Sequence, residues 1–500
     1  MRASIFLLAT SLLAAPLAAQ ESLPLTEEQA QAVREACGFP QTDIIDASGF
    51  DSFDQLDQAL ADRGVPQIVY GGAFRGADFA ALAPRLARTC FHSVDLEGST
   101  WTGARISGLV FVRASMNGAM MAGADLPAVR FEGVDLSQAD LEGASLQGGH
   151  WIGAYWKSSL ESSTLRGARL ADFTFTCSIV MSNACGTQGT DFSQADFTGA
   201  DLSSLPVWGQ DDFSGARFDR SVLDPRALAH FGDDVDFAGP VFFFLTTDED
   251  PAQREVEEFS PPEIAEIRRH IGAGTAADRP SFDCAKASTP SEVLICGEWH
   301  GELRAADRLL AETYAMARDS GLAGAPEQRT WLRRRDACGE FECMEAAYRE
   351  RIGVLLGRLG PPADFRPGET RLYIEEVLAL DPAFRAAPLY RRLVDPLRAS
   401  THQEVALTMR ADRSIDAEGS AIGGNAHLCS LEVEGARFDP SNGWYSATGE
   451  DGTRVPLFRL AGNRLEFRYS GNFGDTPEAA ADYISCGARA GFSTLVDLTR

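Results

Sequence analysis

The sequence lacks several features that would mark common functional classes. After its first twenty residues, no apolar run reaches the roughly 20 residues needed to cross a bilayer. Positive charge is in deficit: 45 lysines and arginines face 72 aspartates and glutamates, for a formal net charge of -27. This balance opposes generic binding to nucleic-acid phosphates. A nucleophile elbow, an HExxH motif and a phosphate-binding loop are also missing. The sequence therefore predicts neither catalysis nor a cofactor, nucleic-acid partner or membrane insertion.

No CxxC pair occurs, and no histidine lies at metal-ligand spacing from a thiol, which disfavours the alternative of a zinc site. An even number of cysteines in an exported chain favours disulfides. The ten candidates are Cys37, Cys90, Cys177, Cys185, Cys284, Cys296, Cys338, Cys343, Cys429 and Cys486.

Export is expected from residues 1–19, which have the pattern of a secretory signal peptide. A basic start at Arg2 precedes an apolar run over 5–13 and a small-residue exit at Ala18 and Ala19. No cysteine precedes Cys37, which argues against a lipid anchor. The expected location is the periplasm or the medium.

A five-residue period is the strongest pattern in the chain. Two residues before each large apolar residue of this pattern stands a small one. From Phe91 to Trp156 every fifth residue is apolar or aromatic, a period that fits neither an α-helix nor a β-strand. We take the large residues to fill the core of a stacked coil, in which only small side chains fit beside them. Representative core positions are Leu126, Phe131, Leu136, Leu141 and Leu146.

The repeat resembles the pentapeptide-repeat family over about residues 68–224. The unit A(D/N)LxX appears as "GADL" at 123–126 and 199–202 and as "QADL" at 138–141. The resemblance implies a right-handed quadrilateral β-helix over 66–225, in which each unit forms one side of a square, with about seven coils. His92 and His150 lie far from any nucleophile in the sequence, and we expect both on the surface.

Helical residues are expected to cover the end of this coil over 20–65. Ala30, Val33 and Cys37 share one face of a short amphipathic helix, which a Cys37–Cys90 disulfide would tie to the repeats. Cys177 and Cys185 flank an irregular stretch and would staple a loop there. Residues 226–278 carry eight excess negative charges and are expected to form a partly structured acidic linker.

Residues 279–360 predict a small α-helical hairpin fastened by disulfides. Leu303, Leu310 and Tyr314 form one apolar stripe, and Ser288 or Thr289 can cap the first helix before Pro290. A helical module of this size has a thin core, which crosslinks would support. The pairs Cys284–Cys296 and Cys338–Cys343 would be local closures, and the crossed arrangement stays open.

The same region, over about 280–359, resembles LprI-type bacterial lysozyme inhibitors. The residues that carry the resemblance include the opening 282–286 and the positions Asp307, Gln328, Trp331, Arg335, Asp336, Tyr348, Arg351 and Ile352. The resemblance implies a protein partner such as a lysozyme or another cell-wall hydrolase. Two loops are candidate contact tips: Glu298, Trp299 and His300 in the first, and Glu340, Phe341 and Glu342 in the second.

The last part of the chain is expected to be a helical connector over 361–400 and an antiparallel β domain over 401–500. Six alternating runs separated by Gly, Asn and Asp predict six strands, joined by a Cys429–Cys486 disulfide. Overall we expect a mainly β, multidomain, exported protein that binds a partner without catalysis. The alternative is a structural scaffold that uses the repeat rod as its contact surface and does not inhibit lysozyme.

Overall fold

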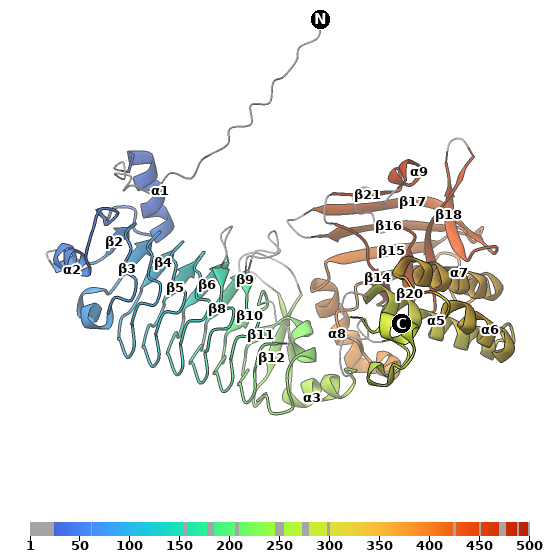
Figure 1. Cartoon of the computed structure of the whole chain (residues 1–500), viewed down its shortest axis with the longest axis horizontal. Helices are drawn as coiled ribbons and strands as arrows, with labels where there is room; N and C mark the ends of the chain where they lie inside the picture. The colour runs from blue at the N-terminus through green and yellow to red at the C-terminus, as the bar shows by residue number, and fades with distance from the viewer. Residues whose placement is uncertain are drawn as a thin grey trace, which may run out of the picture.

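The computed structural model describes residues 25–61, 63–153, 158–177, 185–205, 210–245, 255–272, 280–297, 301–423, 427–449, 452–469, 477–487 and 490–498. The expected signal peptide lies outside them. The protein is mainly β: along the chain, a solenoid is followed by a helical module and then by a closed antiparallel barrel (Figure 1). Among the described residues, every helix is too short or too polar to span a bilayer.

One side of the solenoid is a sheet of stacked parallel strands. In its regular part, Cys90 pairs with Val110 and Val110 pairs with Arg130. Each turn there contains four units of five, as expected for a square coil. The parallel strands are β1 Ile44–Asp46, β2 Gln67–Tyr70, β3 Thr89–His92, β4 Val110–Val112, β5 Arg130–Glu132, β6 His150–Gly153, β8 Thr174–Cys177, β10 Asp201–Leu202, β11 Val222–Leu223 and β12 Val241–Phe244.

The predicted core residues fill the interior of the solenoid. The five representative positions from Leu126 to Leu146 are at most 2% exposed, and the small residues two before them are equally buried. Aromatic rings stack from turn to turn: Phe91 to Phe111 at 5.6 Å and Phe111 to Phe131 at 5.4 Å between centroids. The five-residue period thus reflects alternate burial on each side of the square.

The solenoid is longer than the predicted seven coils, because nine steps separate β1 from β12. At the start, Ile44 pairs with Ile68 and Ile68 with Cys90, so both of these turns are longer than four units. Helix α2 Phe53–Ala61 and the 3-10 helix η1 Ala80–Arg85 take up the additional residues. These insertions break the sequence period, although the backbone continues to coil.

Three turns further along the solenoid are also longer than four units, and one of them, from Asp201 to Val222, is longer by a single residue. His150 pairs with Thr174, and the next turn brings Thr174 to Asp201. Between them β7 Ser158–Ser159 pairs with β9 Cys185–Gly186. Cys177 is disulfide-bonded, and the side chain of Cys185 lies outside the described part of the structure.

The two amino-terminal helices have different places. α2 covers the open end of the solenoid, where Leu56 and Leu60 join its core. α1 Glu27–Cys37 lies instead on the outer face of β2, β3 and β4 (Figure 1), where Val33 packs against Ile68, and Cys37 forms a disulfide with Cys90. α1 packs on this flank because β2, β3 and β4 carry buried residues on both faces, so their outer face also needs cover.

The described part of the expected, partly structured linker contains strands and helices that close the other end of the solenoid. β12 pairs in parallel with β11, and β13 Val256–Phe259 returns antiparallel to β12. The short helix η2 Pro225–Ala229 and α3 Pro261–Arg269 add buried apolar residues to the same core. The acidic residues that the structure describes in this segment are exposed or half-buried.

Eight antiparallel strands close into a barrel, because β16 pairs with both β15 and β17. A further strand, β21 Ile484–Cys486, pairs with β17, and Cys429 and Cys486 form a disulfide at that edge. The eight are β14 Thr370–Ile374, β15 Gln403–Met409, β16 Ile415–Ile422, β17 Leu428–Asp439, β18 Trp444–Thr448, β19 Arg454–Ala461, β20 Arg464–Phe467 and β22 Leu495–Asp497.

The barrel has more strands than the six predicted. β14 lies in the expected helical connector, which also holds the helices η5 Pro382–Ala386 and α8 Pro388–Ala399. β16 turns Ala417 and Ala421 inward, and small residues leave no apolar alternation in the sequence. α9 Glu478–Ala481 packs against β19 and β21.

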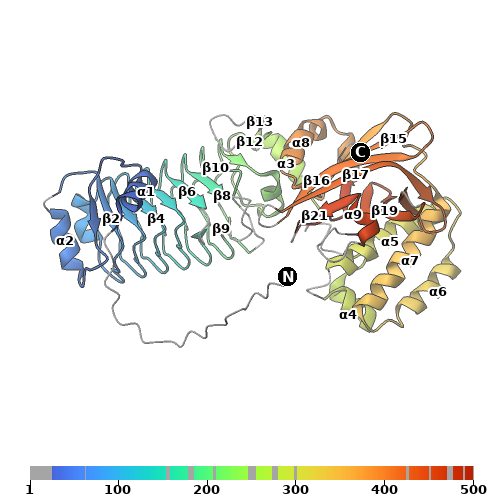
Figure 2. The ribbon, with the colours of Figure 1, turned by 90° about the horizontal axis from the view of Figure 1, so that it is seen from above.

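The helical module lies against the barrel, at the end of the molecule away from α1 and α2 (Figure 2). It comprises the short helix η4 Cys284–Lys286, α4 Pro290–Ile295, α5 Gly301–Asp319, α6 Ala325–Arg335 and α7 Phe341–Leu359. Its core includes Leu303, Trp331 and Tyr348.

Candidate functional site: the helical module and its seat

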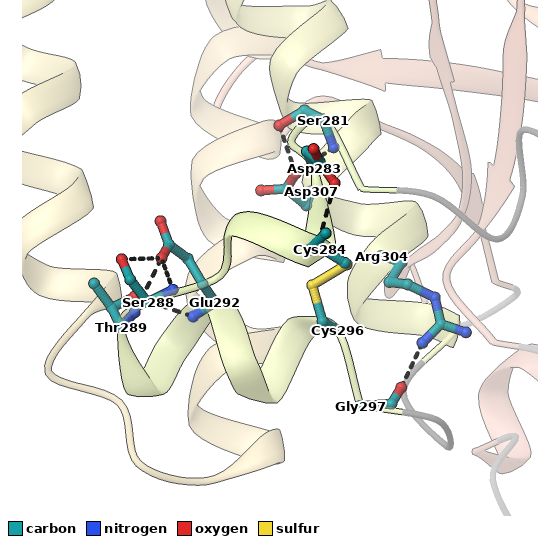
Figure 3. Close-up of a disulfide and its surroundings, with 11 residues drawn as sticks. Ser281, Asp283, Cys284, Ser288, Thr289, Glu292, Cys296, Gly297, Arg304 and Asp307 are labelled. Atoms are coloured by element: carbon teal, nitrogen blue, oxygen red, sulfur yellow. Dashed lines mark hydrogen bonds between the residues drawn. A yellow bond between two sulfur atoms is a disulfide. The ribbon is translucent and has the colours of Figure 1, made fainter.

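The first disulfide of the module joins η4 to the end of α4 through Cys284 and Cys296 (Figure 3). α4 begins at a capping box, in which the Thr289 side chain accepts a hydrogen bond from the Glu292 amide. The Glu292 carboxylate in turn accepts from the amides of Ser288 and Thr289. These backbone hydrogen bonds lower the pKa of Glu292. Of the two capping residues considered, Thr289 is the one that caps.

The second disulfide, Cys338–Cys343, joins the end of α6 to the start of α7. It therefore shapes the loop that holds one predicted contact tip. Glu340, the N-cap residue of α7, and Glu342 are exposed, whereas Phe341 is half-buried against the core of the module. The other predicted tip, Glu298, Trp299 and His300, lies outside the described residues.

A buried carboxylate holds the helices of the module together. Asp307 on α5 is 5% exposed and accepts a hydrogen bond of 2.7 Å from the Tyr348 hydroxyl on α7. Its other oxygen accepts from the amide and hydroxyl of Ser281, at 2.7 and 2.5 Å (Figure 3). The Arg335 guanidinium on α6 lies 3.9 Å from Asp307 and donates to the Tyr348 oxygen at 3.3 Å. One carboxylate thus connects α5, α6, α7 and the segment before η4.

The ionisation of this cluster follows from its burial. Burial raises the pKa of Tyr348, and the negative charge of Asp307 raises it further, so the hydroxyl stays protonated as a donor. For Arg335, burial acts to lower the pKa, but the contacts with Tyr348 and Asp336 outweigh it and leave the pKa raised. The guanidinium stays charged inside the module.

A second charged group joins α6 to α7 nearer the surface. Arg351 donates to Gln328 at 3.0 Å and to Glu327 at 2.6 Å, and Arg358 donates to Glu327 at 2.9 Å. Hydrogen bonds from Arg358 and Arg351 lower the pKa of Glu327 to about 2. Most of the residues that carry the lysozyme-inhibitor resemblance therefore hold helices together and do not form an open pocket.

The module rests on the barrel through two glycines that the sequence analysis did not single out. Gly353 and Gly357, one helical turn apart on α7, face the turn between β17 and β18. A β-carbon at Gly353 would lie 2.6 Å from the carbonyl oxygen of Asn442, and one at Gly357 would lie 2.2 Å from that of Pro440. Backbone thus contacts backbone directly. In the sequence, the only sign of this contact surface, called the seat of the module below, was the spacing G-x-x-x-G within a helix.

Two arginines of the barrel complete the seat. Arg459, 3% exposed, donates to the backbone carbonyl of Arg349 on α7 at 3.3 Å. Arg464, 8% exposed, pairs with Glu312 on α5 at 3.3 Å. The module therefore has both apolar and ionic contacts with one face of the barrel.

The solenoid meets the carboxy-terminal part of the chain at a seam that the predicted linker did not anticipate. Arg226, at the end of the solenoid, donates to Glu375 and to the Ser400 carbonyl, and its guanidinium lies 3.2 Å from Nδ1 of His402. Arg392 on α8 pairs with Glu257 at 2.7 Å. Burial raises the pKa of the neighbouring Asp224. Apolar residues of α8 and η5 also join the solenoid core.

A cavity of about 20 Å³ at the seam, beside Arg385 and Tyr390, has room for one water molecule. Within the parts of the chain that the structure describes, no three His, Cys, Asp or Glu side chains are arranged to hold a metal ion.

His92 is buried, contrary to the surface position expected for it. It ends β3 at 6% exposed, stacks on Tyr70 with 5.7 Å between ring centroids, and has its Nδ1 3.0 Å from the Ser93 hydroxyl. The repeat pattern places His92 outside the core, but α1 covers this part of the outer face. Burial lowers the pKa of His92 to about 4, and the charge of Arg113 acts in the same direction.

We expect the stability of the solenoid to fall in mild acid because of His92. Below its ordinary pKa of 6.5, the unfolded chain binds a proton at this residue that the folded chain does not bind until about pH 4. The free energy of unfolding should therefore drop across that window, by about 3 kcal/mol as an upper figure. Urea unfolding of the full chain at several pH values measures the slope. The variant His92→Gln should show a smaller dependence of the free energy of unfolding on pH. An unchanged dependence would mean that other groups cause it.

Comparison with known proteins identifies the repeats. A family model described as pentapeptide repeats, in 8 copies, matches residues 89–127 and 187–205. No curated protein matches the chain. The match does not extend to the helical module, so its resemblance to lysozyme inhibitors stays a prediction.

Several solved structures are similar to the solenoid. A pentapeptide repeat protein from the thylakoid lumen of Arabidopsis thaliana is 26% identical, with 20% of this chain and 67% of that chain covered and a TM-score of 0.19. QnrB1, a plasmid-mediated fluoroquinolone resistance protein, is 16% identical over 34% of this chain and 87% of its own, with a TM-score of 0.21. HetL from the cyanobacterium Nostoc, involved in heterocyst differentiation regulation, is 20% identical over 34% and 67%, with a TM-score of 0.15.

The family model and the register of the parallel strands agree on the same segment of the chain. Residues 89–127 and 187–205 of the solenoid therefore match pentapeptide repeats.

Proposed function

We propose that this protein is a non-catalytic binding protein of an oxidising compartment, in which the helical module is the binding part and the solenoid and barrel are its rigid support. The observation that carries the proposal is the way the three parts are joined. The module touches the barrel through backbone contacts at Gly353 and Gly357, and the seam at Arg226 joins the barrel to the solenoid. Such contacts hold a surface in a fixed place, as a preorganised binding site requires.

Export supports the choice of compartment. The predicted signal peptide over 1–19 directs the chain out of the cytoplasm, and four disulfides are present in the described residues. Disulfides persist in oxidising surroundings such as the periplasm or the medium. We propose that location for the mature protein.

Lysozyme inhibition is a narrower form of this proposal and rests on the resemblance alone. The residues shared with the inhibitors lie mainly inside the module, which supports a shared fold more than a shared ligand. Glu340 and Glu342 are exposed at the tip of one loop, where acidic side chains suit a cationic enzyme. A scaffold role for the solenoid face is the alternative.

Capture and inhibition assays test the proposal. The full chain, immobilised with its disulfides intact, should retain a specific protein from envelope extract at near-equimolar yield. The variant Gly357→Val, which disturbs the seat of the module, should retain less of it. Equal retention by a reduced, unfolded sample would refute a binding function. In parallel, slower clearing of a cell-wall substrate by lysozyme would identify the enzyme as the partner, and unchanged clearing at high molar excess would exclude it.

A further inference from the structure

The outer face of α6 carries an arginine strip, defined here as Arg329 and Arg333 with Pro326 and Thr330 between and beside them. These residues recur at the three- and four-residue spacing of one helix face, and all four are exposed. Figures 1 and 2 place α6 at the edge of the molecule farthest from the solenoid.

The two guanidiniums of the strip have no anionic partner among the described residues. Arg333 donates only to the Thr330 hydroxyl, at 3.0 Å, and Arg329 makes no hydrogen bond or ion pair there. Their neighbours differ. Arg334 pairs with Glu350 at 2.8 Å, and Arg351 and Arg358 share Glu327. The module therefore pairs most of its other arginines with carboxylates and leaves these two available.

The position of this pair opposes folding stability slightly, because like charges four residues apart on a helix repel by a few tenths of a kcal/mol. The surrounding chain is strongly acidic, with a net charge of -27, so the strip is not a product of overall composition. Leu322, in the loop before α6, is a 41% exposed apolar residue of the same module. Arginine is one of the residue types that are enriched in protein-binding hot spots.

The inner side of α6 keeps the strip rigid. Trp331 and Arg335 are buried in the core of the module, and the Trp331 indole donates to the Ala347 carbonyl of α7 at 3.3 Å. Gln328 and Glu327 are fixed by Arg351. A rigid helix presents its outer side chains at constant spacing, about 6 Å for one turn.

We propose that the arginine strip binds an acidic protein segment that presents two carboxylates about one helical turn apart. Each guanidinium is a planar fork that matches a carboxylate with two parallel hydrogen bonds. Leu322 receives an apolar side chain of the same segment. The proposal rests on the proposed binding function and names the chemistry of its partner.

A short acidic segment fits this surface better than a long polyanion. Nucleic acids and sulfated polysaccharides extend their charge over many residues, and most of this protein's surface would repel them. A cationic enzyme such as lysozyme would be repelled by the strip itself and would need a different face of the module. Only a local cluster of carboxylates meets the strip without meeting the acidic remainder.

Binding of the full chain to designed peptides tests the proposal. The probe is a fluorescent alanine-based helical peptide with two glutamates four residues apart and one leucine. A second peptide of equal composition has its glutamates on opposite faces. The variant Arg329→Glu/Arg333→Glu removes the strip. The variant Arg105→Glu/Arg169→Glu is the matched control, because it changes the charge equally at exposed solenoid arginines.

We expect the strip variant to weaken binding of the first peptide by about tenfold or more, the equivalent of about 1.4 kcal/mol, and the control to leave it within about twofold. The first peptide should also bind more tightly than the second. Equal weakening by both variants, or equal binding of both peptides, would overturn the proposal, as would tighter binding of a heparin fragment or a DNA duplex. If the peptide result fails while the full chain still captures a protein from extract, only the role of the arginine strip is refuted. If the unaltered chain captures no protein from extract, the binding function itself is refuted.

Discussion

Gly357→Val should release the helical module from the barrel. A β-carbon at this position would lie 2.2 Å from the carbonyl oxygen of Pro440, and backbone in a β-turn has little freedom to move away. Overpacking of this kind costs about 3 kcal/mol or more when no flexible side chain can yield. We expect the amides of α7 to lose protection from hydrogen exchange while those of the solenoid keep theirs.

Gly339→Ala is the matched control for this substitution. Gly339 lies in the same module, and a β-carbon there would meet no atom within 4 Å. Its exchange pattern should match that of the unaltered chain. Gly353→Val, one turn earlier against Asn442, should repeat the effect of Gly357→Val. Unchanged protection of α7 in both valine variants would mean that the module does not rest on these glycines.

Asp307→Ala should unfold the module selectively. Its carboxylate is buried and serves Tyr348, Ser281 and Arg335 at once. Removal leaves the buried hydroxyl of Tyr348 and the hydroxyl of Ser281 without their acceptor, while Arg335 keeps its ion pair with Asp336 at 2.7 Å. We expect a loss of about 2 to 4 kcal/mol. Limited proteolysis of the full chain should then cut within 301–359 well before it cuts the barrel.

Two milder substitutions separate charge from hydrogen bonding at this site. Asp307→Asn keeps the shape and an acceptor but removes the charge opposite Arg335. Tyr348→Phe keeps the carboxylate and removes only one donor, at a cost of about 1 to 2 kcal/mol. We expect the order of stability to be unaltered chain, Tyr348→Phe, Asp307→Asn, Asp307→Ala. Resistance of Asp307→Ala to proteolysis at the level of the unaltered chain would contradict the role assigned to this carboxylate.

The regular part of the solenoid could be predicted from the sequence because each of its units buries residues at the same spacing. Phe131 and Leu136 are buried in the solenoid core. The same position of a five-residue unit is buried in each regular turn, because neighbouring turns give it the same environment. The prediction weakened where this local rule stopped. α2 and η1 interrupt the period, and the turn from Thr174 to Asp201 is longer than four units.

The barrel was predicted as a β domain but not as a closed one. Closure depends on β16 pairing on both sides, and its inward residues Ala417 and Ala421 carry little apolar signal. β14 lies among charged residues typical of a helix, and its partners β15 and β22 are distant in sequence. Pairing between strands that are distant in the sequence depends on which segments come together in the folded protein, and no local sequence pattern shows this.

For the candidate site, the sequence identified the residues but not their role. Asp307, Trp331, Arg335 and Tyr348 were singled out by resemblance, and the tertiary structure places them inside the module as mutual supports. The unpaired state of Arg329 and Arg333 became visible only once the ion pairs of their neighbours were known.

By itself, the sequence determined that side chains five apart line a stacked coil, that helices follow and that strands end the chain. These features depend on contacts within a few residues or between identical neighbours. Only the tertiary structure decided that α1 lies on the flank of the solenoid and that two glycines seat the module on the barrel. Such contacts join segments that are far apart in the chain. Whether they form depends on the shapes of the two surfaces and on the absence of a β-carbon at the point of contact, and a sequence period between near neighbours does not record either.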